Sequence, residues 1–148
     1  MKKRILILAL VLVGISSFSF AADVPNINSK VLTSFNREFV NAQEVKWESN
    51  RNFIKASFRI NNMTLSAYYL PNGDQLAVTR FISTTQLPLQ LLTSLKKDYS
   101  NYWISDLFEM SDDNGTEYYV TLENDSQIKV LKSSLAGEWT TYKVVEKL

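Results

Sequence analysis

The chain of 148 residues contains no histidine and no cysteine. Their absence excludes Ser-His-Asp and Cys-His catalysis, the ordinary zinc and copper sites, and structural disulfides. Glycine is scarce, with four residues in the whole chain, and no glycine-rich phosphate-binding loop is present. An enzyme of this composition would have to work with carboxylates, tyrosine or lysine alone. We therefore predict that the protein is not an enzyme and uses no cofactor.

The spacing of the carboxylates does not favour a metal or catalytic site. The densest acidic cluster, Asp112–Glu117, surrounds an Asn-Gly pair that is typical of a hairpin turn. It lacks the alternating ligands over twelve residues that an EF-hand calcium loop needs. Glycoside hydrolysis needs two acids facing each other about 5–9 Å apart, whereas Glu117 and Glu123 lie about 20 Å apart along one strand. A carboxylate-only hydrolase stays as a third alternative.

The first 21 residues have the three parts of an export signal. Met1–Arg4 is basic, Ile5–Ile15 is apolar, and Ser19–Ala21 has the small-x-small pattern of a cleavage site. A helix over the apolar part would be about 16 Å long, too short for a hydrocarbon core of roughly 30 Å. No cysteine follows for lipid attachment. We predict a signal peptide at residues 1–21, a periplasmic or secreted protein, and no membrane anchor after cleavage.

The remaining chain is close to neutral. The signal carries 3 of the 16 basic residues and none of the 15 acidic ones, so 13 bases face 15 acids, a net charge of −2. Such a balance provides no basic surface for the phosphates of nucleic acid or for anionic lipid. We therefore predict neither of them as a partner.

Two stretches of the chain, residues 31–41 and 91–101, match each other in pattern. Apolar residues align with apolar ones, Thr-Ser aligns with Thr-Ser, and a basic residue followed by an acidic one occurs in both. Each stretch has the i, i+1, i+4, i+8 apolar spacing of an amphipathic helix. About forty residues with strand-like alternation follow each helix. We predict one domain, residues 22–148, made of two related units at about 26–82 and 83–148.

After each predicted helix, apolar residues recur at every second position and turn residues interrupt them, as in antiparallel strands joined by short turns. Sheets of this kind need cover on one face, which the two helices can supply. The sequence therefore predicts an α+β fold of tandem α-β-β-β-β units, with antiparallel sheet packed under two helices on one face and open on the other. The predicted strands are Val45–Glu48, Phe53–Ile60, Met63–Leu70, Gln75–Ile82, Trp103–Met110, Thr116–Glu123, Gln127–Lys132 and Trp139–Lys147.

Large side chains on the outward alternation of these strands are the candidate binding residues. Exposed aromatic side chains are typical of protein and glycan interfaces, and neighbouring basic residues would add polar specificity. Ordinary cross-strand pairing on a solvated sheet would explain the same aromatic residues without a partner. The candidates are the aromatic residues Tyr68, Phe81, Tyr119 and Tyr142 and the basic residues Lys55, Arg59 and Lys129.

Several motifs are similar to those of the PepSY-like, β-lactamase-inhibitor-like (BLIP-like) proteins exported by Bacteroidetes. The first unit contributes Asn41–Glu48, with its V-K-W-E strand, and Ser66–Asp74, with its A-Y-Y strand and Asn-Gly turn. The second contributes Leu87-Pro88, Lys97–Tyr99 and Asp113–Val120. The resemblance implies a small exported tandem domain, related to domains that inhibit peptidases and to an inhibitor that clasps β-lactamase with a concave sheet. It brings no inhibitory loop motif.

The leading hypothesis is a non-enzymatic binding or inhibitor-like module that holds a protein or peptide on its open sheet face. The alternative is a periplasmic protein that binds a small molecule or a glycan with the same aromatic residues.

Overall fold

The computed structural model describes residues 26–134 and 137–147, and the predicted signal at residues 1–21 lies outside them. Within the described residues, two α-helices each precede four β-strands. A short 3-10 helix that the sequence did not predict, Thr84–Gln86 (η1), comes just before the second α-helix. The α-helices are α2 (Ser29–Glu38) and α3 (Leu89–Asp98), and the strands are β1 (Gln43–Ser49), β2 (Ile54–Ile60), β3 (Met63–Tyr69), β4 (Gln75–Phe81), β5 (Trp103–Asp112), β6 (Gly115–Glu123), β7 (Gln127–Ser134) and β8 (Trp139–Glu146).

The strands form one eight-stranded antiparallel sheet in the order β1 to β8, so each strand pairs with its neighbours in the sequence. Most connections are short turns, but the one from β4 to β5 contains η1 and α3. Residues Val78–Phe81 of β4 still pair with Phe108–Ser111 of β5 and make the sheet continuous. The Arg80 guanidinium crosses this pair and donates from Nε and Nη2 to the Glu109 carboxylate, both at 3.0 Å. The predicted α+β fold is confirmed.

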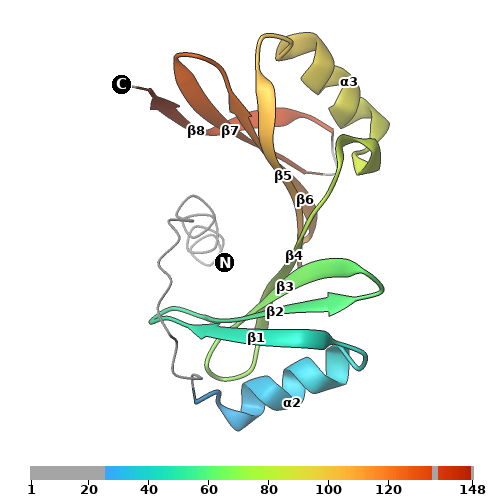
Figure 1. The fold of residues 1–148 in the computed structure, drawn as a ribbon, viewed down its shortest axis with the longest axis vertical. Coiled ribbons are helices and arrows are strands. Elements are labelled where there is room, and N and C mark those ends of the chain that lie inside the picture. The colour runs from blue at the N-terminus through green and yellow to red at the C-terminus, as the bar shows by residue number, and fades with distance from the viewer. Residues whose placement is uncertain (1–25, 135–136, 148) are drawn as a thin grey trace.

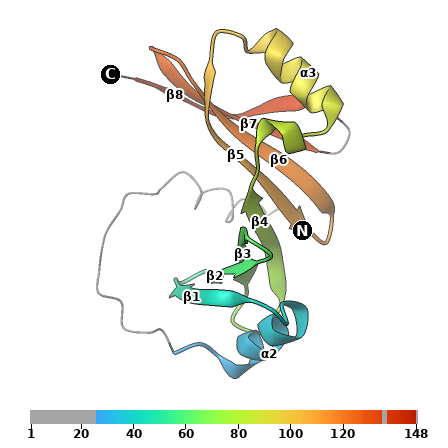
Figure 2. The same cartoon turned by 45° about the vertical axis from the view of Figure 1, so that its right-hand side comes forward.

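The two helices lie at opposite ends of the molecule and on the same side of the sheet (Figures 1 and 2). The sheet curves away from them, so the face without helices is the concave one. We call the side under α2 and α3 the helix face and the other side the open face. A right-handed twist that accumulates over eight strands produces curvature of this kind.

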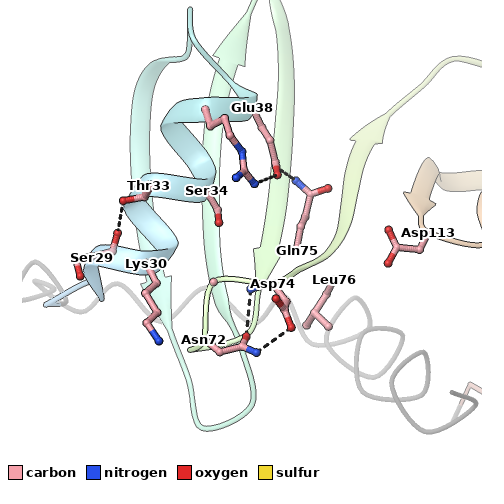
Figure 3. Close-up of a pocket in the computed structure, with 12 residues that line it drawn as sticks. Ser29, Lys30, Thr33, Ser34, Glu38, Asn72, Asp74, Gln75, Leu76 and Asp113 are labelled. Atoms are coloured by element: carbon pink, nitrogen blue, oxygen red, sulfur yellow. Dashed lines mark hydrogen bonds and ion pairs between the residues drawn. The ribbon is translucent and has the colours of Figure 1, made fainter.

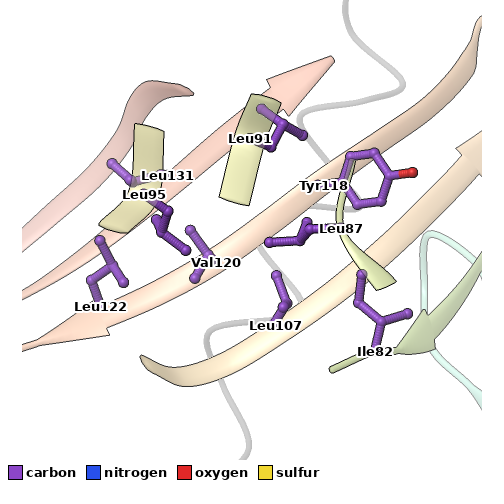
Figure 4. Close-up of a cluster of buried hydrophobic side chains, with 9 residues drawn as sticks. All are labelled: Ile82, Leu87, Leu91, Leu95, Leu107, Tyr118, Val120, Leu122 and Leu131. Atoms are coloured by element: carbon purple, nitrogen blue, oxygen red, sulfur yellow. The ribbon is translucent and has the colours of Figure 1, made fainter. Parts of the chain in front are cut away.

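The helix face carries a hydrophobic core under each helix. Under α3, Leu91 and Leu95 pack on the strands of the second unit (Figure 4), and the Trp139 indole N–H donates to the Leu91 carbonyl at 2.9 Å. Under α2, the Phe35 ring lies edge-on to Phe58 at 5.0 Å. The first core contains Ile82, Leu87, Leu91, Leu95, Leu107, Tyr118, Val120, Leu122 and Leu131; the second contains Val31, Phe35, Ile54, Ala56, Phe58, Ala67 and Tyr69.

A third cluster of buried side chains lies on the open face, where the sequence predicted exposed aromatic side chains. It crosses the junction between the two halves of the sheet and draws on β3 to β7. Because the open face is concave, side chains from neighbouring strands converge there and cover one another. The cluster contains Phe53, Tyr68, Ala77, Phe108, Met110, Tyr119 and Val130, with Leu76 and Tyr142 packed against it.

Candidate binding face

A row of aromatic side chains crosses the open face at the middle of the sheet. Phe81, Phe108 and Tyr119 are direct cross-strand partners on β4, β5 and β6. The Phe108 and Tyr119 rings stack at 4.9 Å with an interplanar angle of 3°, and the Phe81 ring lies edge-on to Phe108 at 6.4 Å. Tyr142 of β8 closes the row, edge-on to Tyr119 at 6.1 Å. Residues directly opposite each other in an antiparallel pair share a face, so the register itself builds this row.

The four aromatic candidates differ in exposure. Phe81 is 61 % exposed and Tyr142 is half-buried, as residues able to contact a partner should be. Tyr68 and Tyr119 are each only 2 % exposed, so their prediction as exposed anchors is wrong. Both do lie on the open face, but the curvature buries them: Phe53 covers Tyr68 at 5.5 Å, and Phe108 stacks on Tyr119. Tyr68 and Tyr119 therefore form part of the packed base beneath the more exposed side chains of the open face.

The buried phenols are not available for acid–base chemistry at neutral pH. Burial raises the pKa of Tyr68, and burial together with the negative charge of Glu117 raises the pKa of Tyr119. Both groups therefore stay protonated, and the Tyr119 hydroxyl donates to Glu117 Oε2 at 3.3 Å. Their arrangement is that of structural hydrogen-bond donors rather than of general bases.

A small hollow opens on the open face beside Phe81. It has a volume of about 90 Å³, and Tyr68 and Phe108 contribute its apolar wall. The hydroxyls of Thr64, Ser66 and Thr79 and the ammonium-bearing chain of Lys55 complete the lining, together with Arg80 and Phe81. Small-molecule sites usually measure about 300–1,000 Å³, so a hollow of this size suits one inserted side chain.

The basic candidates Lys55 and Arg59 lie on the open face of β2 and are engaged in ion pairs. Lys55 Nζ is 3.4 Å from Glu48 and Arg59 Nη1 is 3.3 Å from Glu44, both acids coming from the edge strand β1. Such exposed pairs contribute little to stability, so they can exchange partners at small cost. The two residues therefore form a polar border along one side of the hollow and its surroundings.

The prediction of Lys129 as a binding residue of the open face is wrong, because the register of β7 places it on the helix face. Glu123 pairs with Ile128, so four residues separate the paired positions and the inward alternation changes from even to odd numbers. The Lys129 ammonium lies on the helix face, over the rings of Tyr99 and Tyr102 at 5.8 and 5.2 Å. Lys132 takes its place on the open face, 5.7 Å above the Tyr119 ring and 2.9 Å from Glu117.

Sequence alternation also left Trp103 out of the candidate set, although it is 50 % exposed on the open face. It pairs with Glu123, whereas Phe108, five residues further along β5, pairs with Tyr119 on the same face. A bulge between Ile104 and Asp106 resets the alternation, and no residue type in the sequence marks it. The signal that the sequence offered was a tryptophan at the start of a predicted strand.

A separate polar cleft of about 670 Å³ lies between α2 and the turn from β3 to β4 (Figure 3). Glu38 points across it and accepts hydrogen bonds from the Gln75 amide and, at 3.4 Å, from the Tyr69 hydroxyl. Most of the side chains that line it are polar, and the predicted aromatic anchors lie elsewhere, on the open face. The lining residues are Ser29, Lys30, Thr33, Ser34, Arg37, Glu38, Asn72, Gly73, Asp74, Gln75, Leu76 and Asp113.

Two further findings concern the described residues alone. Nowhere in residues 26–134 and 137–147 do three or more acidic side chains gather as a metal site would require. Among the helices of these same segments, none is long and apolar enough to cross a membrane.

Solved proteins from Bacteroides have folds similar to that of this chain. A BLIP-like protein from Bacteroides fragilis NCTC 9343 is 20 % identical, with a TM-score of 0.71 over 83 % of this chain and 86 % of that one. A DUF2874 family protein from Bacteroides ovatus ATCC 8483 is 15 % identical, with a TM-score of 0.72 over 84 % and 89 %. A protein from Bacteroides eggerthii DSM 20697, provisionally described as periplasmic, is 9 % identical, with a TM-score of 0.71 over 84 % and 90 %.

At these identities the likeness concerns the fold, and the predicted resemblance to BLIP-like proteins is confirmed at that level. No protein-family model matches the chain. No curated protein matches it either.

Proposed function

We propose that the protein is a non-enzymatic module that holds a protein or peptide partner on its open face. The observation that carries this proposal is Phe81, a large apolar side chain that is 61 % exposed at the centre of the concave sheet. It is supported by a ring stack that is otherwise buried. A rigid aromatic side chain that protrudes from a packed base can bury its area on binding with little loss of conformational freedom.

The surroundings of Phe81 have the layout of a protein interface. Beside it lies a hollow that fits one side chain, and around both lies a border of polar and charged groups. Protein interfaces commonly combine an apolar centre with a polar rim in this way. The match in fold to a protein described as BLIP-like agrees with an inhibitor-like mode of binding.

The small-molecule alternative receives less support from the same face. The hollow of about 90 Å³ is several times smaller than the usual ligand pocket. A sugar that stacks on an exposed ring would need only Phe81 or Trp103, and the response of the Phe81→Ser variant distinguishes such a ligand from a peptide.

The location of the proposed function is outside the cytoplasm. This part of the proposal rests on the three-part pattern of residues 1–21. Mass spectrometry of the protein purified from the cells that make it should find Ala22 as the first residue. An N-terminus that retains Met1 would contradict it.

The binding proposal is tested with peptides selected from a random displayed library on the immobilised protein. Their dissociation constants are then measured for the wild type and for Phe81→Ser. The exposed part of the Phe81 ring amounts to about 100 Å² of apolar area, worth about 2.5 kcal/mol when a partner covers it. We therefore expect Phe81→Ser to weaken binding roughly 60-fold.

Leu89→Ser is the matched control, because Leu89 is also a highly exposed apolar side chain but lies on α3. Peptides that use the open face should bind this variant as they bind the wild type. Equal losses in the two variants, or no loss in Phe81→Ser, would remove the open face as the binding surface. A sugar or metabolite that raises the melting temperature of the wild type but not of Phe81→Ser would show that the open face binds a small molecule rather than a protein or peptide.

A further inference from the structure

Trp103, the first residue of β5, belongs to a site that already binds one ammonium group, which comes from the chain itself. The Lys147 side chain reaches over the Trp103 ring, with Nζ 4.9 Å from the ring centroid and 3.0 Å from Glu123 Oε2. Lys147 follows the last residue of β8, and its backbone N–H donates to the Ser126 carbonyl at 2.7 Å. Lys147 therefore lies outside β8, and its side chain makes the contacts with Trp103 and Glu123.

A second carboxylate, that of Asp106, lies on the same face one pair further along. Asp106 pairs with Thr121, two residues from Glu123 on β6. Burial raises the pKa of Asp106, and the negative charge of Glu123 raises it further. The two carboxylates therefore repel each other, and a cation near both of them would stabilise both.

We infer that this site receives a basic side chain of the partner, an arginine or a lysine, which takes the place of the Lys147 ammonium over Trp103 and beside Glu123, on the face that also carries Asp106. The inference rests on the proposed function, because it names the chemistry that a partner of the open face must offer there. The charge is complementary: two carboxylates and the face of an indole ring all favour a cation.

Arginine fits the site better than lysine does. Its planar guanidinium can stack on the half-exposed Trp103 ring and still direct N–H groups at two carboxylates, which the point charge of one ammonium group cannot match. Displacing the Lys147 ammonium costs little free energy, since its ion pair is partly solvated and the backbone hydrogen bond to Ser126 can stay in place.

The position of the site relative to Phe81 restricts the partner further. Phe108, which lines the hollow beside Phe81, and Trp103 are five residues apart on β5, a distance of about 16 Å. An extended partner segment that follows β5 lacks the bulge of that strand, and its side chains alternate between two sides, so it would carry an apolar side chain and a basic one about four or six residues apart. The same segment would occupy both sites at once.

The first experiment uses acetyl-arginine amide and its neutral isostere acetyl-citrulline amide, with the indole N–H of Trp103 followed by NMR. We expect a saturable shift with the arginine probe alone, in the millimolar range. Lys147→Ser removes the competing ammonium and should tighten binding about five- to tenfold. Lys143→Ser, a loss of the same charge in the middle of β8, should leave it unchanged.

The second experiment uses the peptides selected on the whole protein. Those that carry a basic residue about four or six positions from an apolar one should bind Lys147→Ser more tightly and Glu123→Gln about tenfold more weakly than the wild type. Replacing the basic residue of the peptide by glutamine should abolish both differences. Circular dichroism and the melting temperature confirm that each variant is folded.

The two proposals fail in different ways. Peptides that need Phe81 but show no basic residue, no response to Glu123→Gln and no gain with Lys147→Ser would overturn this inference and leave the proposed function standing. Equal shifts with the arginine and citrulline probes would also overturn it. Arginine-specific binding at Trp103 without any Phe81-dependent peptide would support the cation site and count against the proposed function.

Discussion

The buried side chains of the open-face cluster should stabilise the protein as a hydrophobic core does, and a single substitution can test this. Phe108 is 7 % exposed although no helix covers it, because Tyr119 stacks on one face of its ring and Phe81 lies at its edge. Phe108→Ala therefore removes a buried aromatic side chain at the junction of the two halves of the sheet. The protein should then lose stability as though a core residue had been deleted.

The magnitude follows from the burial. Replacing a buried phenylalanine by alanine costs about 3–5 kcal/mol, to which the lost ring stack contributes about 1 kcal/mol. We expect a loss near the lower limit, about 3 kcal/mol, because one side of the site opens to the concave face. Phe81→Ala, at a neighbouring position that is 61 % exposed, should cost about 1 kcal/mol.

The assay is urea unfolding at equilibrium, followed by tryptophan fluorescence and by far-ultraviolet circular dichroism. Both signals should give the same midpoint if the sheet unfolds as one unit. The change in free energy of unfolding for Phe108→Ala should be about three times that for Phe81→Ala. Equal and small losses, below about 1 kcal/mol, would mean that the open face is solvated and that the account of its packing is wrong.

Three other outcomes follow from single contacts. Glu109→Gln should cost about 1–2 kcal/mol in urea unfolding, since it weakens the two-pronged hydrogen bond with Arg80, and an unchanged midpoint would show that this pair does not hold β4 to β5. Gly73→Ala should cost about 2–3 kcal/mol, because Gly73 has φ +94° and the new Cβ would lie 3.0 Å from the Lys30 carbonyl oxygen; a stable variant would contradict that turn geometry. Burial raises the pKa of Tyr69 from 10.0 to about 12, so its contribution to stability is complete below pH 10 and is lost between pH 10 and 12; Tyr69→Phe should make the alkaline decline shallower, and an equally steep decline would refute this cause.

The sequence was sufficient for the two α-helices, the eight strands and the fold class. All eight strands were predicted to within about two residues at most ends, because turn residues such as those of Pro71–Asp74 interrupt a clear alternation of period two. Both helices were predicted from their apolar stripes. Local pattern determines these features, and local pattern is what a sequence displays directly.

The site was harder to predict, for reasons that are also physical. Alternation is counted along a strand, so an irregularity in register changes which residues share a face without changing the composition. The bulge near Ile104 hid the face of the residues before it, and the four-residue spacing before Ile128 reversed the faces of β7. These two irregularities explain the omission of Trp103 and the misplacement of Lys129. The burial of Tyr119 depends on the curvature of the whole sheet, which is a property of eight strands together.

If the proposed function is right, a partner contacts Phe81 on the open face. A photo-reactive phenylalanine analogue placed at position 81, and in a parallel experiment at position 89 on α3, tests it in the cells that produce the protein. Light should yield a discrete adduct from position 81, identified by mass spectrometry as one protein, and none from position 89. No adduct at position 81, or the same adduct at both positions, would contradict the account.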